Sequence, residues 1–380
     1  MIYFDNAATT EMSPQALATY QQVATRMMGN PSSLHQLGEQ ATRILQASRQ
    51  QIAELLAKEP SEIFFTSGGT ESDNWAIKGV AFEKAYLGKH IIISAVEHPA
   101  VRESALWLES QGFEVDVAPV DAQGRLLIDA FKALLREDTI LVSIMAVNNE
   151  VGAIQPLKEV AAILADKPKV TFHVDAVQSV GKLALEEVLL PRVDLASFSA
   201  HKFHGPRGVG FLYKKLGKKI TPLLNGGGQE EGLRSTTENV AGIAAMAKAL
   251  RLTLETAEQD RQKLKAMKEV LYQALTDFPA VSLYSGLAGF VPNILTFGIS
   301  GVRGEVLVHA FENHAIFLST TSACSSKAGK PAGTLLAMGV PTKKAQTAVR
   351  ISLDEINTMA EVEQFLTVFR LIYKETEKVR

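Results

Sequence analysis

The sequence has one cysteine, no long apolar run and almost no net charge. A single Cys among 380 residues excludes an internal disulfide, and no apolar run approaches the roughly 18 residues that cross a bilayer. The formal net charge of −2 gives no reason to expect strong non-specific binding to nucleic acid or membranes. The N-terminus lacks the basic region, apolar core and cleavage site of a signal peptide. These absences predict a cytoplasmic protein with no membrane partner and no direct nucleic-acid partner.

The remaining composition is that of an ordinary globular protein, with 46% hydrophobic and 21% charged residues. Its length suggests one large domain and a smaller one. From about residue 40 to about residue 215, short apolar runs alternate with amphipathic helix patterns. The runs are 63–65, 91–94, 140–147, 170–174, 195–198 and 209–213, and the helix patterns include 75–85, 100–111 and 157–165. Strands alternating with helices predict an α/β fold with a mostly parallel sheet covered by helices on both faces.

Beyond residue 242 the pattern changes. A long helical pattern runs to about residue 277, strand-like runs follow at 293–299 and 349–353, and a last amphipathic helix covers about 359–374. This mixture predicts a smaller α+β domain.

Lys202 and Asp175 are the first candidates for chemistry. Each lies at the end of a strand-like run, and a glycine-rich turn follows Lys202. A lysine amine forms a Schiff base with the aldehyde of pyridoxal phosphate. An acid holds the pyridine nitrogen protonated, so that the ring can act as an electron sink. These two residues alone do not distinguish a pyridoxal phosphate site from an ordinary α/β protein that happens to carry an Asp and a Lys on its loops.

The segment Thr66-Ser-Gly-Gly-Thr70 joins a strand-like run to a helical pattern. Such a turn presents free backbone N–H groups and the positive end of a helix dipole, so Gly69 and Thr70 are expected to bind a phosphate. The segment lacks the ending of a P-loop and the spacing of a dinucleotide fingerprint. A simple helix N-cap by Ser67 or Thr70 is the alternative interpretation.

Several polar residues share one kind of position. Thr66, His98, Asn149, Asp175 and Lys202 each follow a strand-like run. Ligands of open α/β sheets bind beyond the carboxyl ends of the strands. The placement therefore groups these residues in one predicted site.

Ten segments in a fixed order carry a family resemblance through nearly the whole chain. They are 4–10, 29–35, 66–74, 97–99, 148–152, 175–181, 199–210, 226–240, 322–326 and 349–353. Through them the chain resembles cysteine desulfurases of the NifS/IscS type, in the class V aminotransferase group of fold-type I pyridoxal phosphate enzymes. The resemblance implies a cofactor-binding large domain of residues 14–252, with 1–13 and 253–380 forming the small domain. It also implies a homodimer with pyridoxal 5'-phosphate as cofactor and L-cysteine as substrate, and no metal.

The resemblance gives individual residues roles around the cofactor ring. Lys202 is expected to bind the cofactor and to move the proton at the substrate Cα, and Asp175 to pair with the pyridine nitrogen. Gln178 resembles the residue that hydrogen-bonds the phenolic oxygen of the cofactor. His98 resembles the residue that stacks on the ring, and with Lys202 and Cys324 it is expected to be catalytic.

The phosphate needs several donors. Besides the helix start at Gly69 and Thr70, the side chains of Ser199 and His201 are expected to supply them. Thr237 matches the family residue that reaches the phosphate from the partner subunit.

Arg350 matches the family residue that holds the substrate α-carboxylate, with help from Asn149. A planar guanidinium binds a carboxylate through two parallel hydrogen bonds. A structural salt bridge is the alternative interpretation of Arg350.

Cys324 distinguishes between reaction types. It lies in a small, polar and basic segment, whereas most free cysteines are buried among apolar residues. Lys327 and Lys330 favour the thiolate, which is the nucleophile. We therefore expect an exposed, mobile loop on which Cys324 takes the substrate sulfur as a persulfide. The resemblance implies passage of that sulfur to an iron–sulfur scaffold or to a tRNA-thiolating enzyme.

Four positions depart from the pattern of the family. Glu231 stands where Arg is usual, and Thr236, Thr321 and Asp354 each stand where Gly is usual. A β-branched Thr is costly where φ is positive, so these loops are expected to differ in shape. The reversed charge at Glu231 is expected to alter contact with an acceptor or with the partner subunit.

Two other classes of function stay open at this point, a related enzyme and a non-catalytic protein. A selenocysteine lyase, a β-lyase or an aminotransferase would use the same fold, although simple transamination needs no thiol. A non-catalytic assembly partner is the third possibility, and the glycine replacements near Thr237 and Cys324 are its only support.

Overall fold

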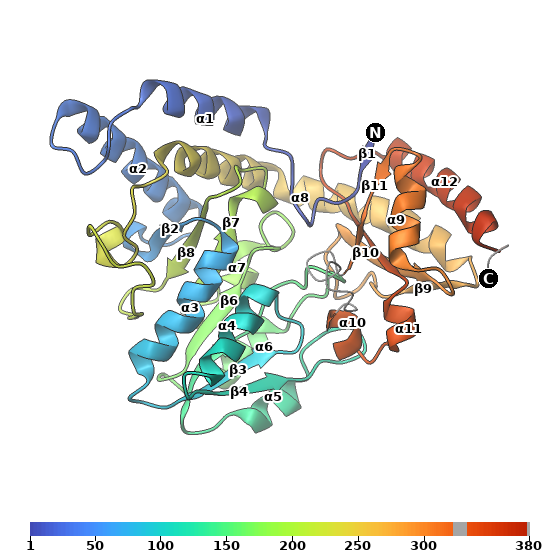
Figure 1. Cartoon of the computed structure of the whole chain (residues 1–380), viewed down its shortest axis with the longest axis horizontal. Helices are drawn as coiled ribbons and strands as arrows, with labels where there is room; N and C mark the ends of the chain where they lie inside the picture. Colours follow the sequence, from blue (N-terminus) through green and yellow to red (C-terminus); the bar gives the residue numbers. More distant parts are fainter. Residues whose placement is uncertain (322–332, 378–380) are drawn as a thin grey trace.

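The computed structural model describes residues 1–321 and 333–377. Figure 1 shows a large sheet with its helices at one end of the molecule and a smaller sheet at the other, with helix α8 (Val240–Thr276) running between them. The predicted pattern change near residue 242 therefore falls at the start of this connecting helix.

The large sheet has seven strands in the order β2-β8-β7-β6-β5-β3-β4. They are β2 (Ile63–Thr66), β3 (His90–Ser94), β4 (Glu114–Ala118), β5 (Thr139–Ser143), β6 (Thr171–Asp175), β7 (Leu195–Ser199) and β8 (Gly210–Lys214). Neighbours from β4 to β7 pair in parallel, and β8 is antiparallel to both β7 and β2. The predicted α/β class with a mostly parallel sheet is confirmed. Strand β4 was not predicted, and the run at 140–147 leaves its strand after Ser143.

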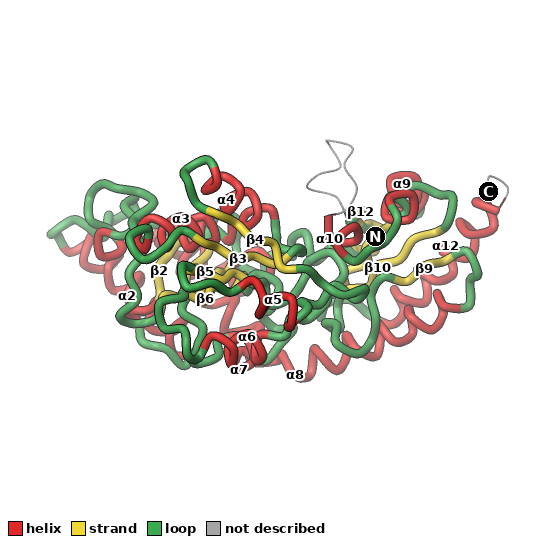
Figure 2. The backbone as a smooth tube through the Cα atoms, turned by 90° about the horizontal axis from the view of Figure 1, so that it is seen from below, coloured by secondary structure: helices red, strands yellow, loops and turns green. Residues whose placement is uncertain are grey.

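Both faces of this sheet are covered by helices, as Figure 2 shows. On one face, α3 (Gly69–Lys84) and α4 (Pro99–Glu109) pack Trp75 and Leu108 against Ile91 and Ile93. The other face holds α2 (Gln36–Leu55), α5 (Ile128–Leu134), α6 (Leu157–Leu164), α7 (Leu185–Val188) and the first half of α8, which form a second core with Ile92. Successive isoleucines of β3 point to opposite faces because strand side chains alternate.

The smaller sheet has the order β12-β13-β10-β9 and is antiparallel throughout. Its strands are β9 (Val281–Leu283), β10 (Ile294–Ile299), β12 (Ser319–Thr320) and β13 (Ala348–Ser352), and it packs against α9 (Gly304–Glu312), α12 (Met359–Glu377) and the second half of α8. Short helices α10 (Gly333–Ala337) and α11 (Thr342–Ala345) precede β13, and one-turn 3-10 helices lie at η1 (Pro60–Glu62), η2 (Ala200–Lys202) and η3 (Glu230–Gly232).

The N-terminal segment lies against the smaller sheet before it crosses to the larger one. Strand β1 (Ile2–Tyr3) pairs in parallel with β11 (Ile316–Phe317), and Phe4 is buried in the core of the small sheet. Helix α1 (Pro14–Arg26) then packs along α8. Residues 5–11 therefore run between the two sheets, where the predicted site residues converge. Among the described residues, no helix combines the length and apolar character that crossing a membrane requires.

Candidate active site

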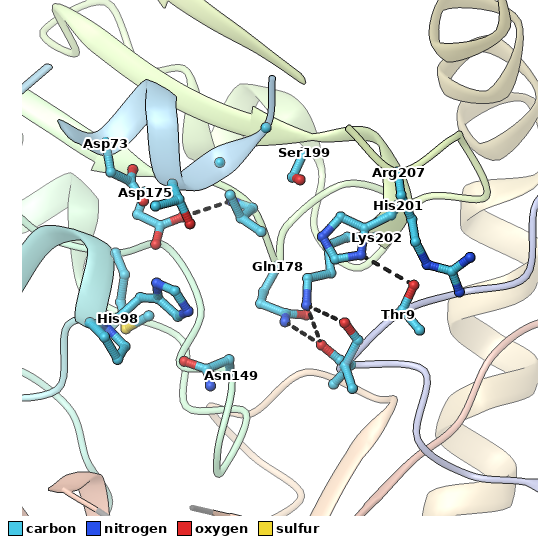
Figure 3. Close-up of a pocket in the computed structure, with 18 of the residues that line it drawn as sticks. Thr9, Asp73, His98, Asn149, Asp175, Gln178, Ser199, His201, Lys202 and Arg207 are labelled. Atoms are coloured by element: carbon cyan, nitrogen blue, oxygen red, sulfur yellow. Dashed lines mark hydrogen bonds between the residues drawn. The ribbon is translucent and has the colours of Figure 1, made fainter. Parts of the chain in front are cut away.

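A cavity of about 590 Å³ opens where the carboxyl ends of the large-sheet strands meet the N-terminal segment and β13. Ten of the predicted site residues line it, namely Gly69, Thr70, His98, Asn149, Asp175, Gln178, Ser199, His201, Lys202 and Arg350. Figure 3 shows Asp175 and His98 on one side of the cavity and Lys202 and His201 on the other. Three predicted residues are not among them. Thr66 and Thr237 line a smaller neighbouring cavity, and Cys324 falls outside the described residues, as do Lys327 and Lys330.

Lys202 is held by backbone carbonyl groups of the N-terminal segment. It ends the single turn η2, which follows β7 directly. Its Nζ donates to the carbonyl oxygens of Ala7 at 2.7 Å and Ala8 at 2.8 Å. Gln178 donates to the same Ala7 oxygen at 2.9 Å. This role of Ala7 and Ala8 was not predicted, because small apolar residues near a chain end have no distinguishing pattern.

Asp175 is the last residue of β6 and is buried. Its Oδ1 accepts a hydrogen bond from Val177 N at 3.0 Å. Burial raises the pKa of Asp175, and the hydrogen bond from Val177 N and the charge of Lys202 partly offset that rise. A protonated ring nitrogen beside the carboxylate would compensate its burial further, because an opposite charge favours the ionised form.

Two more buried acids lie behind Asp175, and the sequence did not single them out. Burial raises the pKa of Asp73 well above its ordinary value, and the charge of Asp175 adds to the effect. Burial also raises the pKa of Glu97 to about 8. Asp73 Oδ1 and Glu97 Oε2 are buried without a hydrogen-bond partner among the described residues. A pKa of about 8 keeps Glu97 largely protonated at neutral pH.

His98 caps the start of α4, where Pro99 takes the first helical position that suits proline. Its Nδ1 accepts a hydrogen bond from Ala100 N at 3.1 Å, which leaves the proton of the neutral ring on Nε2. Burial lowers the pKa of His98. A neutral, oriented imidazole thus faces the cavity, a geometry suited to stacking on a flat ring.

The opposite end of the cavity has the chemistry of an anion site. Helix α3 begins at Gly69 after Gly68, whose φ is 147°, and no side chain caps it. The alternative of a simple N-cap by Ser67 or Thr70 is therefore wrong, and the first N–H groups of the helix are left for a ligand. A Cβ on Gly69 would lie 2.7 Å from Val177 Cγ2, so the close approach requires glycine.

Other polar side chains line the same cavity. Ser199 and His201 line the cavity, and so does Arg207, which was not predicted. His201 Nδ1 lies 3.2 Å from the Thr9 hydroxyl. Burial lowers the pKa of His201 to about 4, and the charges of Lys202 and Arg207 act in the same direction. An anion here would meet a helix dipole, a guanidinium and hydroxyl donors together.

Arg350 marks the substrate end of the cavity. It lies in the middle of β13 with 5% of its surface exposed. Nη1 donates to the carbonyl oxygen of Asn149 at 2.7 Å, and Nη2 donates to Asp5 Oδ1 at 2.9 Å. Its Nε is buried without a partner among the described residues. The structure thus combines a structural ion pair to Asp5 with a donor that is still available, and Asp5 was not predicted.

Glu150 is a further acid on this side that the sequence analysis did not single out. Burial raises its pKa to about 7, against the effects of hydrogen bonds from Thr334 and the charge of Arg350. Asn148 also donates to Thr334 Oγ1 at 3.1 Å. Residues 148–150 therefore contact the first residues of α10, directly after the undescribed segment 322–332. On the other side of that segment, Ser319 of β12 pairs with Arg350, and Thr321 lines the cavity.

Thr237 lines a smaller cavity of about 150 Å³, which shares Ser67 and Gly208 with the main one. Its side chain is exposed, and it does not reach the main cavity of its own chain. The position on an exposed edge is compatible with a role in a second subunit.

The four residues that depart from the family pattern differ in their backbone angles. The described non-glycine residues with positive φ are Ala57, His204, Glu230, Glu231 and Ala315. Thr236, Thr321 and Asp354 therefore have ordinary backbone angles, and no strain arises from their side chains. Glu231 is exposed at φ 58°, next to Glu230, which binds Arg49 at 2.6 Å and Phe65 N at 2.8 Å.

Comparison with known proteins identifies the class to which this fold and site belong. The family described as Aminotransferase class-V matches residues 2–365, and the chain belongs to that family. A NifS/IcsS protein homolog of Lactobacillus delbrueckii subsp. bulgaricus is 53% identical over 380 residues, covering 100% of this chain and 99% of that protein. The cysteine desulfurase IscS of Clostridium botulinum is 39% identical over 381 residues, covering 100% and 96%.

Similar solved structures point to the same family. One described as a NifS-like protein has a TM-score of 0.91 and 39% identity, covering 98% of this chain and 99% of that one. The NifS-like protein of Rickettsia africae has a TM-score of 0.87 and 30% identity, covering 98% and 99%. Within its family the chain is thus of the NifS/IscS cysteine desulfurase type.

Pyridoxal phosphate is the cofactor of this type of enzyme, and the cavity fits it at three points. The uncapped start of α3 suits the phosphate, the buried Asp175 suits a protonated ring nitrogen, and the Lys202 amine suits the aldehyde.

Proposed function

We propose that this protein is a cysteine desulfurase that converts L-cysteine to L-alanine and holds the released sulfur on Cys324 as a persulfide. The observation that carries the proposal is the convergence of Lys202, Asp175 and Arg350 on one cavity, Lys202 from the turn η2 after β7 and the two others from strands β6 and β13. Relatives that match this chain over its full length are named cysteine desulfurases, which supports the substrate and the reaction.

When bound, the cofactor supplies an electron sink for the bond at the substrate Cα. Lys202 binds it and then carries the Cα proton, while the carbonyl groups of Ala7 and Ala8 hold Nζ at the edge of the cavity. The carboxylate of Asp175 stabilises positive charge on the ring nitrogen. His98 would stack on the ring and hold its orientation.

Arg350 binds the α-carboxylate of L-cysteine through its remaining donors. Its Nε is buried and unpartnered, and Asp5 already orients the guanidinium. A buried donor without a partner is costly, so a bound carboxylate recovers that cost. The backbone carbonyl of Asn149 accepts a hydrogen bond from Nη1 and so holds the guanidinium in place at the cavity.

In the sulfur-transfer step, the thiolate of Cys324 attacks the sulfur of the substrate. The new S–S bond forms as the Cβ–S bond of L-cysteine breaks, and the electron pair of that bond stays with Cβ. A proton then completes the methyl group of alanine. The persulfide sulfur passes to an acceptor protein, either an iron–sulfur scaffold or a tRNA-thiolating enzyme.

The active unit in this proposal is a cytoplasmic homodimer. Thr237 would complete the phosphate site of the partner subunit, since it is exposed and lies outside the main cavity of its own chain. Residues 14–252 would form the cofactor-binding domain, and residues 1–13 with 253–380 the small domain.

The test is incubation of the cofactor-loaded protein with L-cysteine and a reductant, with alanine and sulfide both quantified. Wild type is compared with Cys324→Ala, Lys202→Ala and the exposed control Lys265→Ala. Equal amounts of alanine and sulfide from wild type and control, absent from the two site variants, are expected. Sulfide with pyruvate that persists in Cys324→Ala would instead identify a β-lyase and overturn the proposal.

A further inference from the structure

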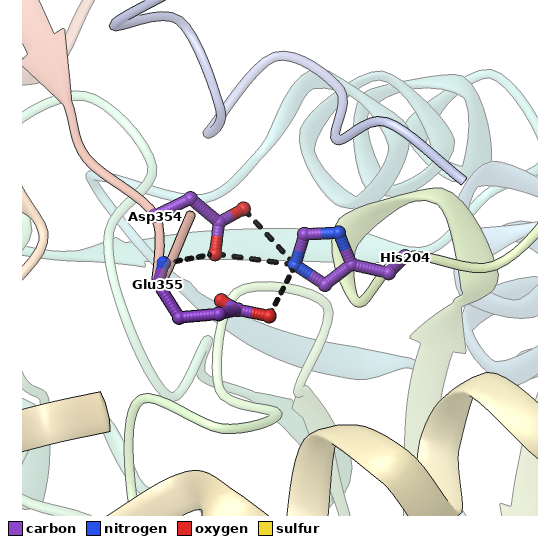
Figure 4. A group of neighbouring side chains, drawn as sticks. All are labelled: His204, Asp354 and Glu355. Carbon is purple, nitrogen blue, oxygen red and sulfur yellow. Dashed lines mark hydrogen bonds and ion pairs between the residues drawn. The ribbon is translucent and has the colours of Figure 1, made fainter. Parts of the chain in front are cut away.

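Four charged side chains outside the cavity lie close together, namely His204, Asp354, Glu355 and Lys182, and Figure 4 shows the first three. His204 Nε2 lies 3.2 Å and 3.1 Å from the two oxygens of Asp354 and 2.7 Å from Glu355 Oε1. Lys182 Nζ lies 3.6 Å from Asp354 Oδ1. Asp354 is 0% exposed, His204 6% and Lys182 8%. We name these four residues the charge cluster.

The hydrogen bonds of His204 fix its charge. Its Nδ1 lies 2.9 Å from the carbonyl oxygen of Glu11, which can only accept, so Nδ1 carries a hydrogen. Its Nε2 faces two carboxyl groups and donates to them, so the ring is an imidazolium. Burial alone would lower the pKa of His204, but the hydrogen bonds to Asp354 and Glu355 outweigh burial and raise it to about 10.

Asp354 carries the matching negative charge. Burial would raise its pKa, but Lys182 and His204 hold the pKa well below its ordinary range. Burial raises the pKa of Glu355. His204, Asp354 and Glu355 place their ligand atoms within 4.8 Å of one another, a spacing suited to a metal. However, Lys182 and the protonated His204 already supply the cations, so the cluster is an ion-pair network of the protein itself.

The charge cluster joins the segments that carry the active-site residues. Lys182 lies at the end of the loop that begins at Asp175, His204 lies two residues after Lys202, and Asp354 lies four residues after Arg350. The N-terminal segment is included, because His204 N also donates to Thr10 Oγ1 at 2.9 Å. That segment supplies the Ala7 and Ala8 carbonyl groups that hold Lys202.

We propose that the charge cluster fixes the position of Arg350 relative to Lys202 and thereby sets the affinity for the amino-acid substrate. This inference rests on the proposed function. Asp354 is a positioning residue in it, since it touches neither cofactor nor substrate. A buried ion pair is weak evidence for stability, but its strict partner geometry can specify one arrangement of the parts it joins. Where the family resemblance leads one to expect Gly, Asp354 gives this chain a link that a glycine cannot make.

Other charged groups face the cluster and have to be considered in its pH dependence. Asp260 of α8 acts on Lys182 and favours its charged form. Lys263, also of α8, donates to the backbone carbonyl of Glu355. With Asp354 neutralised, Glu355 and the carbonyl of Glu11 remain as the partners of His204, so the pKa of His204 falls toward its ordinary value.

The experiment compares the cofactor-loaded wild type with Asp354→Asn and the exposed control Asp166→Asn. In Asp354→Asn, the KM for L-cysteine is expected to rise about tenfold, equivalent to ~1.4 kcal/mol, while kcat stays within about twofold. Between about pH 7 and pH 9 the KM of the variant should rise further, because His204 loses its proton there, whereas the wild type keeps its imidazolium until about pH 10. The control should match wild type.

A lower melting temperature with unchanged KM would mean a purely structural cluster and would overturn the inference. If Asp354→Asn does not fold, His204→Asn gives the same test, because Asn tolerates the positive φ of 61° at that position. Binding of L-alanine to the cofactor-loaded proteins, measured by calorimetry, separates the two proposals. Weaker binding in the variants upholds the positioning role even if wild type releases no sulfur, and equal binding refutes it even if wild type is a desulfurase.

Discussion

Replacing Glu97 with Gln is expected to remove a pH-dependent loss of stability. Glu97 is buried, and burial raises its pKa to about 8 although Ser94 and Met145 both donate hydrogen bonds to its Oε1. The difference from the ordinary value of 4.5, at about 1.36 kcal/mol per pKa unit, corresponds to roughly 5 kcal/mol. The pKa of Glu97 is higher in the folded state than in the unfolded state. The protonated side chain therefore contributes this free energy to stability in full below about pH 4.5, and the contribution is lost as the pH rises through about 8.

The variant keeps the shape of the side chain but does not titrate. The amide oxygen of Gln accepts the same two hydrogen bonds, and its NH2 group replaces an oxygen that has no partner among the described residues. Urea unfolding without cofactor, between about pH 5 and pH 9, measures the free energy of unfolding of wild type, Glu97→Gln and the exposed control Glu109→Gln. Wild type and control should lose stability more steeply with pH than Glu97→Gln. Equal slopes for all three would refute a protonated, buried Glu97.

Three further substitutions test the cavity. Arg350→Lys should raise the KM for L-cysteine by about 10- to 100-fold, since Lys cannot make paired hydrogen bonds to a carboxylate; exposed Arg303→Lys is the control, and an unchanged KM would contradict the role. Gly69→Ala should weaken cofactor binding in a direct titration by about 1–3 kcal/mol, because its Cβ would lie 2.7 Å from Val177 Cγ2; wild-type affinity would show that the helix start is not the phosphate site. Asp175→Asn should retain the cofactor but lower kcat by about 100-fold or more, because the ring nitrogen loses its charged partner; wild-type turnover would exclude that pairing.

The large sheet was predictable because its central strands are buried on both faces. The runs at 91–94 and 140–143 are nearly continuous in apolar residues, and each became a strand. Strand β4 escaped prediction because it lies at the sheet edge, half exposed, and carries Glu114 and Asp116 among its valines. An apolar run indicates a buried strand, and an edge strand has too few buried residues to form such a run.

The site was only partly predictable, for a related reason. Lys202 and Asp175 lie at recognisable strand ends. Ala7 and Asp5, by contrast, belong to the site only through contacts with Lys202 and Arg350, which lie 195 and 345 positions further along the chain. Asp73 and Glu97 were missed because a charged residue in a helix or loop is usually exposed, and only the fold shows that these two are buried. The resemblance supplied the role of His98, because its position after a strand-like run groups it with the site without indicating what it does.

The central claim is that the cavity delivers the sulfur of L-cysteine to Cys324. Its most direct test is mass spectrometry of the cofactor-loaded protein after incubation with sulfur-labelled L-cysteine and no reductant. The account predicts one labelled sulfur on the peptide that contains Cys324 in wild type, and none on that peptide in Lys202→Ala. Label that is absent from that peptide in wild type, or equally present in Lys202→Ala, would contradict it.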